Sequence, residues 1–216
     1  MSRIALIAGT TGLVGAQLVQ RLLAGDAYTQ IKLLTRRPLA LDDARITTLI
    51  TDFSDLNALG EQLRADDVFC CLGTTLKTAG SKAAFERVDY GMVLDLARAA
   101  KAQGAKQFLV ISAAGASATS PAFYSRVKAR MESDAAAVGF ESVHILRPSL
   151  LLGARGEPRM GERAAQRLMP ALSPLLRGSL KKYRAVRAED VAAAMLELAK
   201  RNQRGTHIHH LPLDNA

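Results

Sequence analysis

Tyr124 and Lys128 have side chains that could move a proton, and they stand four residues apart in a predicted helix. Side chains at this spacing share one helix face, about one turn apart. An ammonium group beside a phenol favours the phenolate, so we expect Lys128 to lower the pKa of Tyr124 toward neutrality. Tyr124 would then exchange a proton with a carbonyl or an alcohol. The plain alternative is a surface pair, and the position of the helix after the fifth predicted strand favours the chemical interpretation.

Three glycines lie in the segment Gly9-Thr10-Thr11-Gly12-Leu13-Val14-Gly15, between a predicted strand and a predicted helix. In such a turn the first glycine permits a tight bend and the second lets the backbone approach phosphates. The third lets the helix pack closely on the strand. The helix N-terminus offers unpaired N–H groups and partial positive charge to phosphate oxygens. We therefore expect this segment to bind the pyrophosphate of a dinucleotide, with a purely structural glycine turn as the alternative.

Two arginines follow the second predicted strand, where an acidic residue usually binds the free ribose 2′-hydroxyl of NAD. The sequence there is Thr35-Arg36-Arg37, without an acid. A guanidinium group forms charge-assisted, bidentate hydrogen bonds with a 2′-phosphate. The predicted cofactor is therefore NADP(H) in preference to NAD, the alternative being solvated loop arginines. Asp52 and Phe53, just after the third predicted strand, are expected to flank the adenine.

Short apolar runs alternate with helical patterns along the chain and would position these residues. Nearly continuous apolar runs are typical of parallel strands buried on both faces, and the alternation gives right-handed crossovers. The predicted strands are 4–8, 31–35, 46–50, 68–72, 107–112, 143–146 and 206–210. The predicted helices are 13–23, 56–63, 82–103, 125–138 and 188–200. The sequence thus predicts an α/β fold over 1–216, a single Rossmann-type domain with a doubly wound parallel sheet. Residues 150–187 would form a small C-terminal cap on the substrate side.

The formal net charge of +9 is concentrated between Arg155 and Arg187, a segment that contributes +7 of it. Nucleic acid is disfavoured as a partner, because aromatic content is only 5% and there is no Trp to stack on bases. We expect a small-molecule substrate, with an anionic one bound by these arginines as an option and a solvated basic surface as the plain alternative. The sequence leaves the oligomeric state open.

The sequence has no apolar run near the roughly 20 residues that a membrane span needs, and no separate leader precedes the first strand. We therefore expect a cytoplasmic protein without a membrane span. Cys70 and Cys71 are adjacent and are predicted to be buried free thiols. His207 and His209 would share one face of the last strand, but no matching Cys or acidic set accompanies them, so a metal site is disfavoured.

Several of these segments also resemble a known superfamily. The glycine motif at 9–15, the YSRVK segment at 124–128 and the RPS segment at 147–149 are similar to an atypical short-chain dehydrogenase/reductase. More narrowly, FCCLGTT at 69–75, RVDY at 87–90 and FY at 123–124 resemble the Tat-interacting-protein (CC3-like) branch, which is known for a bound NADP. The similarity covers most of residues 1–155 and thins toward the C-terminus.

The resemblance implies roles for individual residues. Tyr124 would be the acid/base, and Lys128 would tune its pKa and hold the ribose. The family's active-site serine falls on Ala113, so either Ser112 serves instead or part of the chemistry is lost. Asp89 stands where many relatives have Asn. The implied cofactor contacts also include Leu72, Gly73, Thr74, Thr75, Arg147, Pro148, Ser149 and Leu150. Of these, Pro148 and the backbone after it would meet the nicotinamide amide.

The implied activity is that of an NADP-dependent oxidoreductase. Hydride would pass between the nicotinamide and a carbonyl or alcohol substrate, such as a sugar nucleotide, while Tyr124 shuttles the proton. An epimerase acting through a transient ketone is a variant of the same chemistry. The alternative is an NADP(H)-sensing regulatory protein that presents the basic segment to a partner, which Ala113 favours slightly.

Overall fold

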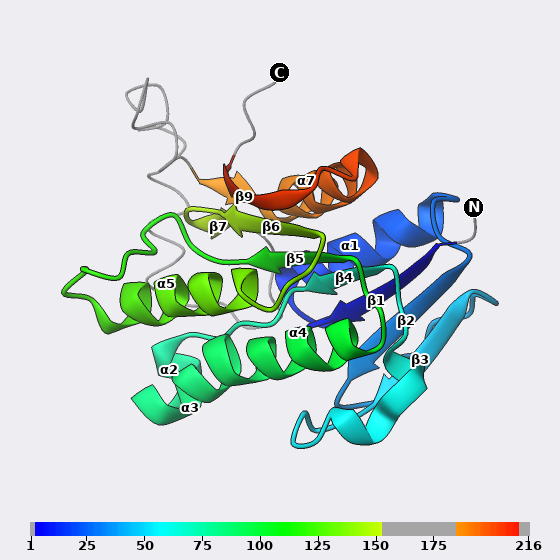
Figure 1. Ribbon diagram of the computed structural model, residues 1–216, viewed down its shortest axis with the longest axis horizontal. Helices are drawn as coiled ribbons and strands as arrows, with labels where there is room; N and C mark the ends of the chain where they lie inside the picture. Colours follow the sequence, from blue (N-terminus) through cyan, green and yellow to red (C-terminus); the bar gives the residue numbers. More distant parts are fainter. Residues whose placement is uncertain (1–2, 153–184, 212–216) are drawn as a thin grey trace.

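Seven strands form one sheet in which every neighbouring pair is parallel, in the order β3-β2-β1-β4-β5-β6-β9. The structure, a computed structural model, describes residues 3–152 and 185–211 (Figure 1). The strands are β1 Ile4–Ala8, β2 Gln30–Thr35, β3 Ile46–Ile50, β4 Asp67–Cys70, β5 Gln107–Ile111, β6 Ser142–Arg147 and β9 Gly205–His210. Two further short strands, β7 Leu151–Leu152 and β8 Val186–Arg187, pair with each other. The strand order reverses between β1 and β4, which is where open α/β sheets bind their ligands.

Helices cover both faces of the sheet, because the strands are apolar on both sides. One face is packed by α1 and α7, and the opposite face by α4 and α5 (Figure 1). The α-helices are α1 Leu13–Ala24, α2 Leu76–Ala79, α3 Lys82–Glu86, α4 Met92–Ala102, α5 Phe123–Ala136 and α7 Ala188–Arg201. A 3₁₀ segment, η1, spans Asn57–Leu63, and a π turn, η2, spans Arg87–Gly91 between α3 and α4. The predicted doubly wound α/β fold is confirmed.

The predicted elements agree with the structure to within two residues at most ends, with three instructive differences. The strand predicted to reach residue 72 ends at Cys70, because the chain then turns to pass the glycine segment. The predicted helix 56–63 is a 3₁₀ segment with a non-helical Gly60 inside it. The predicted helix 82–103 contains the π turn, a local widening that is frequent at functional sites.

Most of the predicted cap lies outside the described residues, at 153–184, together with all of its basic residues except Arg187. In the two described ranges, no helix combines the length and the apolar character that a membrane crossing requires. The same ranges contain no group of three or more His, Cys, Asp or Glu side chains arranged for a metal ion.

Candidate functional site

The glycine turn between β1 and α1 is held by contacts that only glycine allows. Gly9 has a φ of +81°, and a Cβ at that position would lie 2.4 Å from the carbonyl oxygen of Cys71. A Cβ at Gly15 would lie 2.1 Å from the carbonyl oxygen of Gly9, so α1 packs directly on the turn. Gly12 begins the helix and supplies no side chain to cap its first N–H groups. These features suit close approach of a phosphate to the start of α1.

A cavity of about 470 Å³ opens beside this turn, at the switch point between β1 and β4. This volume is within the range of small-molecule and cofactor sites. Of the predicted cofactor residues, those that line it are Gly9, Thr10, Thr11, Gly12, Arg36, Phe53, Leu72, Gly73 and Thr74. The structure therefore brings together the glycine turn, the end of β2 and the loop after β4.

Other predicted cofactor residues do not line this cavity. Val14, in the first turn of α1, is packed in the core, and Leu13 beside it is half-buried. Thr75 accepts a hydrogen bond from the N–H of Thr78 and so caps α2. The carboxylate of Asp52 is exposed and accepts a hydrogen bond from the Ser54 N–H. Arg37 is also exposed, and among the two predicted arginines it is Arg36 that lies on the cavity wall.

Phe53 forms a wall of the cavity with an unusual backbone conformation. Its φ of +64° lies in the left-handed region, which is costly for a bulky side chain. Its carbonyl accepts a hydrogen bond from the Arg87 guanidinium at 2.7 Å, and its N–H donates to the hydroxyl of Thr51. These contacts hold the conformation that buries the ring, and a strained residue at a cavity is typical of a functional position.

Lys128 and Tyr124 lie on α5 as the helical spacing predicts, but Lys128 has a second partner. Its side chain is 4% exposed, and its ammonium lies 2.8 Å from the Oδ1 of Asp89. It also donates a hydrogen bond to the carbonyl of Ile111, at the end of β5. Burial lowers the pKa of Lys128, but Asp89 and then Tyr124 raise it more, and the overall shift is upward. Lys128 is therefore a buried, charged and paired ammonium.

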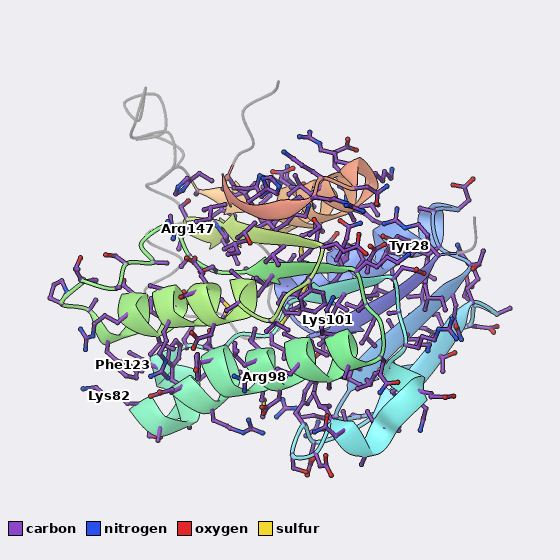
Figure 2. The ribbon with its side chains drawn as sticks, viewed as in Figure 1. Tyr28, Lys82, Arg98, Lys101, Phe123 and Arg147 are labelled. Atoms are coloured by element: carbon purple, nitrogen blue, oxygen red, sulfur yellow. The ribbon has the colours of Figure 1, made fainter. Side chains whose placement is uncertain are left out.

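The expected lowering of the Tyr124 pKa is wrong. Burial raises the pKa of this phenol, the Lys128 ammonium lowers it and the Asp89 carboxylate raises it again, so that the overall direction is upward. Lys128 alone would lower this pKa, but burial of the phenol and the Asp89 carboxylate together outweigh its effect. The centroids of the Tyr124 and Phe85 rings lie 5.4 Å apart, and the Phe85 ring also packs against the Phe123 ring. The Lys82 ammonium lies 5.5 Å from the Phe123 ring, and the two labelled side chains are neighbours in Figure 2.

Asp89 is the functional candidate to which sequence reasoning gave no role. It lies in the π turn, is 1% exposed, and accepts a hydrogen bond from the Thr74 N–H at 2.8 Å through Oδ2. One carboxylate thus bridges the cavity wall at Thr74 and the ammonium of Lys128. The available signal was an acidic residue on the apolar face of a predicted helix, between the buried Phe85 and Val93, because a buried acid requires a cationic or hydrogen-bonding partner.

Ser112 does not present its hydroxyl to open space. The Oγ atom is fully buried and has no hydrogen-bond partner among the described residues, while the backbone N–H donates to the Leu146 carbonyl at 2.7 Å. The neighbouring position is Ala113, which carries no hydroxyl. A catalytic contact from Ser112 would therefore require the segment after β5 to move.

Arg147 also has a partner that the sequence argument missed. Its guanidinium forms two hydrogen bonds with the Glu132 carboxylate, at 2.9 and 2.5 Å, and so ties β6 to α5. Pro148 is buried, and its carbonyl accepts a hydrogen bond from the Ala114 N–H. The carbonyl of Leu150 accepts one from Val186, and Ser149 is half-buried. These four predicted cofactor contacts lie outside the lining of the cavity beside the glycine turn.

The strand order, the glycine turn and the cavity at the switch point together define a nicotinamide-dinucleotide-binding Rossmann domain. The chain belongs to the NAD dependent epimerase/dehydratase family, whose model matches residues 5–212.

Similar proteins agree with this assignment. Protein fmp52, mitochondrial, from Aspergillus clavatus is 36% identical over 203 residues, which cover 90% of this chain and 85% of that protein. Protein HTATIP2 from Rattus norvegicus is 34% identical over 170 residues, covering 77% and 70%. The latter confirms the predicted resemblance to the Tat-interacting-protein branch. In fold, the chain matches the DesIV double mutant (dTDP-glucose 4,6-dehydratase) from Streptomyces venezuelae with NAD and DAU bound. The TM-score is 0.72 at 18% identity, over 96% of this chain and 74% of that one.

The predicted cytoplasmic location is wrong by the same comparisons. The relative from Aspergillus clavatus is named a mitochondrial protein, and those from Aspergillus terreus and Candida albicans carry the same word in their names. The prediction relied on the lack of a recognisable leader, which is a weak basis for a location.

Proposed function

We propose that this protein is an NADP(H)-dependent oxidoreductase that acts on a carbonyl or alcohol substrate, with Tyr124 as its acid/base. The observation that carries the proposal is the bridge from Thr74 through Asp89 to Lys128. This bridge connects the wall of the cavity beside the glycine turn to the pair of residues that could transfer a proton. A cavity without such a connection would support binding alone.

The proposed cofactor contacts begin at the glycine turn and extend to the end of β2 and the loop after β4. The glycine turn and the start of α1 would hold the pyrophosphate. The turn carries no side chains at its glycines that would block a phosphate, and no side chain caps the first N–H groups of α1. Phe53 would pack against the adenine, and Arg36 would pair with a 2′-phosphate, which favours NADP over NAD. Lys128 would reach the nicotinamide ribose. When bound, the nicotinamide would supply or accept the hydride.

Tyr124 would handle the proton at its phenolic oxygen. Because its pKa is raised, this side chain is protonated at neutral pH and is suited to donate to the oxygen of a carbonyl substrate. In the reverse direction the phenolate would accept the proton of an alcohol, so the same side chain would serve both reduction and oxidation. Sugar nucleotides belong among the alcohol substrates to test, because the matched DesIV is named a dTDP-glucose 4,6-dehydratase.

The test follows wild type and Tyr124→Phe in both directions: NADPH consumption with a panel of carbonyl compounds, and NADP+ reduction with alcohols and sugar nucleotides. Loss of the proton donor should reduce turnover by about 100-fold or more. The affinity for NADPH should stay the same, because the phenol is not part of the cavity lining. Tyr90→Phe is the matched control, because the Tyr90 hydroxyl bonds to Asp134 away from Lys128. Equal activity of wild type and Tyr124→Phe would contradict the proposed role.

The second candidate function is an NADP(H)-sensing regulatory protein with little catalysis. The observation in its favour is the pair of neighbouring positions after β5, where Ser112 has a buried hydroxyl and Ala113 has none. The same experiment separates the two functions. Binding of NADPH without turnover on the whole panel, and without any effect of Tyr124→Phe, would favour the sensor.

A further inference from the structure

Phe53 combines a buried ring in the cavity wall with a backbone that its side chain disfavours. Among the described residues other than glycine, only Phe53 and Asn202 have a positive φ. Asn202 ends α7, a place where asparagine commonly adopts this conformation. An aromatic residue has no such preference, so contacts from elsewhere must keep Phe53 in the left-handed region.

The guanidinium of Arg87 connects the backbone of Phe53 to the π turn. Nη2 donates to the Phe53 carbonyl at 2.7 Å, and Nη1 donates to the Asp95 carboxylate at 2.5 Å. The planar fork of a guanidinium fixes both directions at once. A Cβ at Gly91 would lie 3.0 Å from Nη1 of Arg87, so this glycine leaves the space in which the guanidinium lies. Arg87 is thus held from its own turn while it orients the Phe53 carbonyl.

This hydrogen bond joins two of the segments that form the cavity. Val88, the residue after Arg87 in the π turn, lines the cavity, as does Phe53 in the loop after β3. The same loop is tied to the end of β2, because the Thr51 N–H donates to the Thr35 carbonyl at 2.9 Å. The contact therefore lies at the part of the cavity where the adenosine half of the cofactor is proposed to bind.

We propose that Arg87 is a positioning residue that holds Phe53 in its left-handed conformation and so prepares the adenine subsite of the cofactor cavity. This inference rests on the proposed function and adds to it the residue that shapes the adenosine end of the site. Arg87 acts through Phe53 and without contact to the cofactor. When its hydrogen bond is lost, the loop relaxes to ordinary backbone, and the apparent affinity falls by the fraction of molecules that leave the competent conformation.

The first test uses adenosine 2′,5′-bisphosphate, which carries the adenosine half of NADP and needs no hydride transfer. Isothermal titration calorimetry compares the full chain as wild type, Arg87→Met and Arg130→Met. Arg87→Met should lose about tenfold of the affinity, or 1.4 kcal/mol. Arg130→Met is the matched control and should stay within about twofold, because Arg130 is an exposed arginine that pairs with Glu86. Unchanged affinity in Arg87→Met would overturn the inference. Absence of binding by the wild type would retire the proposed cofactor, and the inference with it.

The second test distinguishes action through Phe53 from direct contact with the ligand. Glycine adopts a left-handed backbone without strain, so in Phe53→Gly the hydrogen bond from Arg87 has no strain left to hold. Phe53→Gly should weaken binding by itself, and the addition of Arg87→Met should cost less than about twofold more. A further tenfold loss would show that Arg87 contacts the ligand and would overturn the inference. If the loss of the buried ring prevents folding, Phe53→Asn replaces Phe53→Gly, since asparagine also tolerates this backbone.

Gly91→Val covers the case in which Arg87→Met does not fold. Its side chain would occupy the space of the Arg87 guanidinium and displace it while the charge is kept. This variant should weaken the binding of adenosine 2′,5′-bisphosphate in the wild-type background and leave it unchanged in the Phe53→Gly background. Equal affinity of Gly91→Val and the wild type, or an equal loss in both backgrounds, would overturn the inference as well.

Steady-state kinetics gives the functional result. In Arg87→Met the KM for NADPH should rise by about tenfold while kcat stays within about twofold, because the proton-transfer pair on α5 keeps its own contacts. A lower kcat with an unchanged KM would indicate a general structural role and would overturn the inference. Weaker binding of adenosine 2′,5′-bisphosphate by Arg87→Met, together with no turnover by the wild type on any substrate, would support the positioning role and retire the proposed oxidoreductase.

Discussion

Gly15 faces the carbonyl oxygen of Gly9 so closely that a Cβ at Gly15 would lie 2.1 Å from it. The same turn meets β4 from the other side, since a Cβ at Gly9 would lie 2.4 Å from the Cys71 carbonyl oxygen. Contacts of this kind between backbone atoms cannot be relieved by turning a flexible side chain. The turn that would hold the pyrophosphate is therefore fixed by backbone packing on both sides.

Gly9→Ala should destabilise the protein by about 3 kcal/mol, from the left-handed strain together with the backbone overlap. Gly104→Ala is the control, because Gly104 also has a positive φ, +88°, but nothing lies within 4 Å of its Cβ position. Strain alone should cost about 1 kcal/mol there. Urea unfolding measures both values, and NADPH titration should show weaker binding only for Gly9→Ala. Equal destabilisation of the two variants would contradict the packing argument.

Glu132→Gln should cost about 3 kcal/mol, because it leaves the partly buried guanidinium of Arg147 without its counter-ion. The double variant Glu132→Leu with Arg147→Met should cost less than the single one, since no charge is left unpaired. Both are measured by urea unfolding. Because the Arg147 guanidinium is held by Glu132, the double variant should also keep its NADPH dissociation constant within about twofold. A tenfold loss of affinity would show that Arg147 contacts the cofactor, as the resemblance first implied.

His144 should make the stability depend on pH. The Ser142 hydroxyl donates to the Gln203 carbonyl, so it must accept from His144 Nε2, and the Nδ1 atom then accepts from His209 Nε2. Burial, and then His209, lower the pKa of His144 from 6.5 to about 4. The unfolded chain therefore binds this proton at a higher pH than the folded one, and stability must fall as the pH drops from 6.5 to 4.

The loss over that interval should be about 2 to 3 kcal/mol for this group. Urea unfolding at a series of pH values should show a shallower dependence in His144→Gln than in the wild type. His207→Gln, at a half-buried neighbour whose ring nitrogen contacts the Arg204 carbonyl, should keep most of the wild-type dependence. Parallel curves for wild type and His144→Gln would show that His144 does not carry the effect.

Local patterns were sufficient to predict the seven strands of the main sheet, the long helices and the glycine turn, but not α2 or the short strands β7 and β8. Strands such as β1 and β5 are buried on both faces and so appear as short apolar runs, and the glycines of the turn are neighbours in sequence. The separation of α2 from α3 also has a local signal. Thr75 caps α2 and Ser81 caps α3, and Gly80 between the two helices has a φ of +79°. The placement of Arg36 on the cavity followed from its position after β2.

The features that the sequence did not predict depend on contacts between distant residues. Asp89 is 39 positions from Lys128, and no local pattern indicates that the two carry a buried ion pair. The direction of the Tyr124 pKa depends on burial by elements that assemble only in the fold. Arg147 was assigned to the cofactor from its motif alone, without knowledge that Glu132 on α5 would engage it.

The central claim is that the cavity beside the glycine turn binds NADP(H), with Arg36 at the 2′-phosphate. Isothermal titration calorimetry with NADPH and NADH tests it on the purified full chain, with Arg36→Ala beside the control Arg37→Ala. The wild type should bind NADPH more tightly than NADH. Arg36→Ala should lose about tenfold or more of the NADPH affinity and little of the NADH affinity, a difference of about 1.4 kcal/mol or more. Absence of binding heat for NADPH at millimolar concentration, or equal affinity of the wild type for both cofactors, would contradict the account.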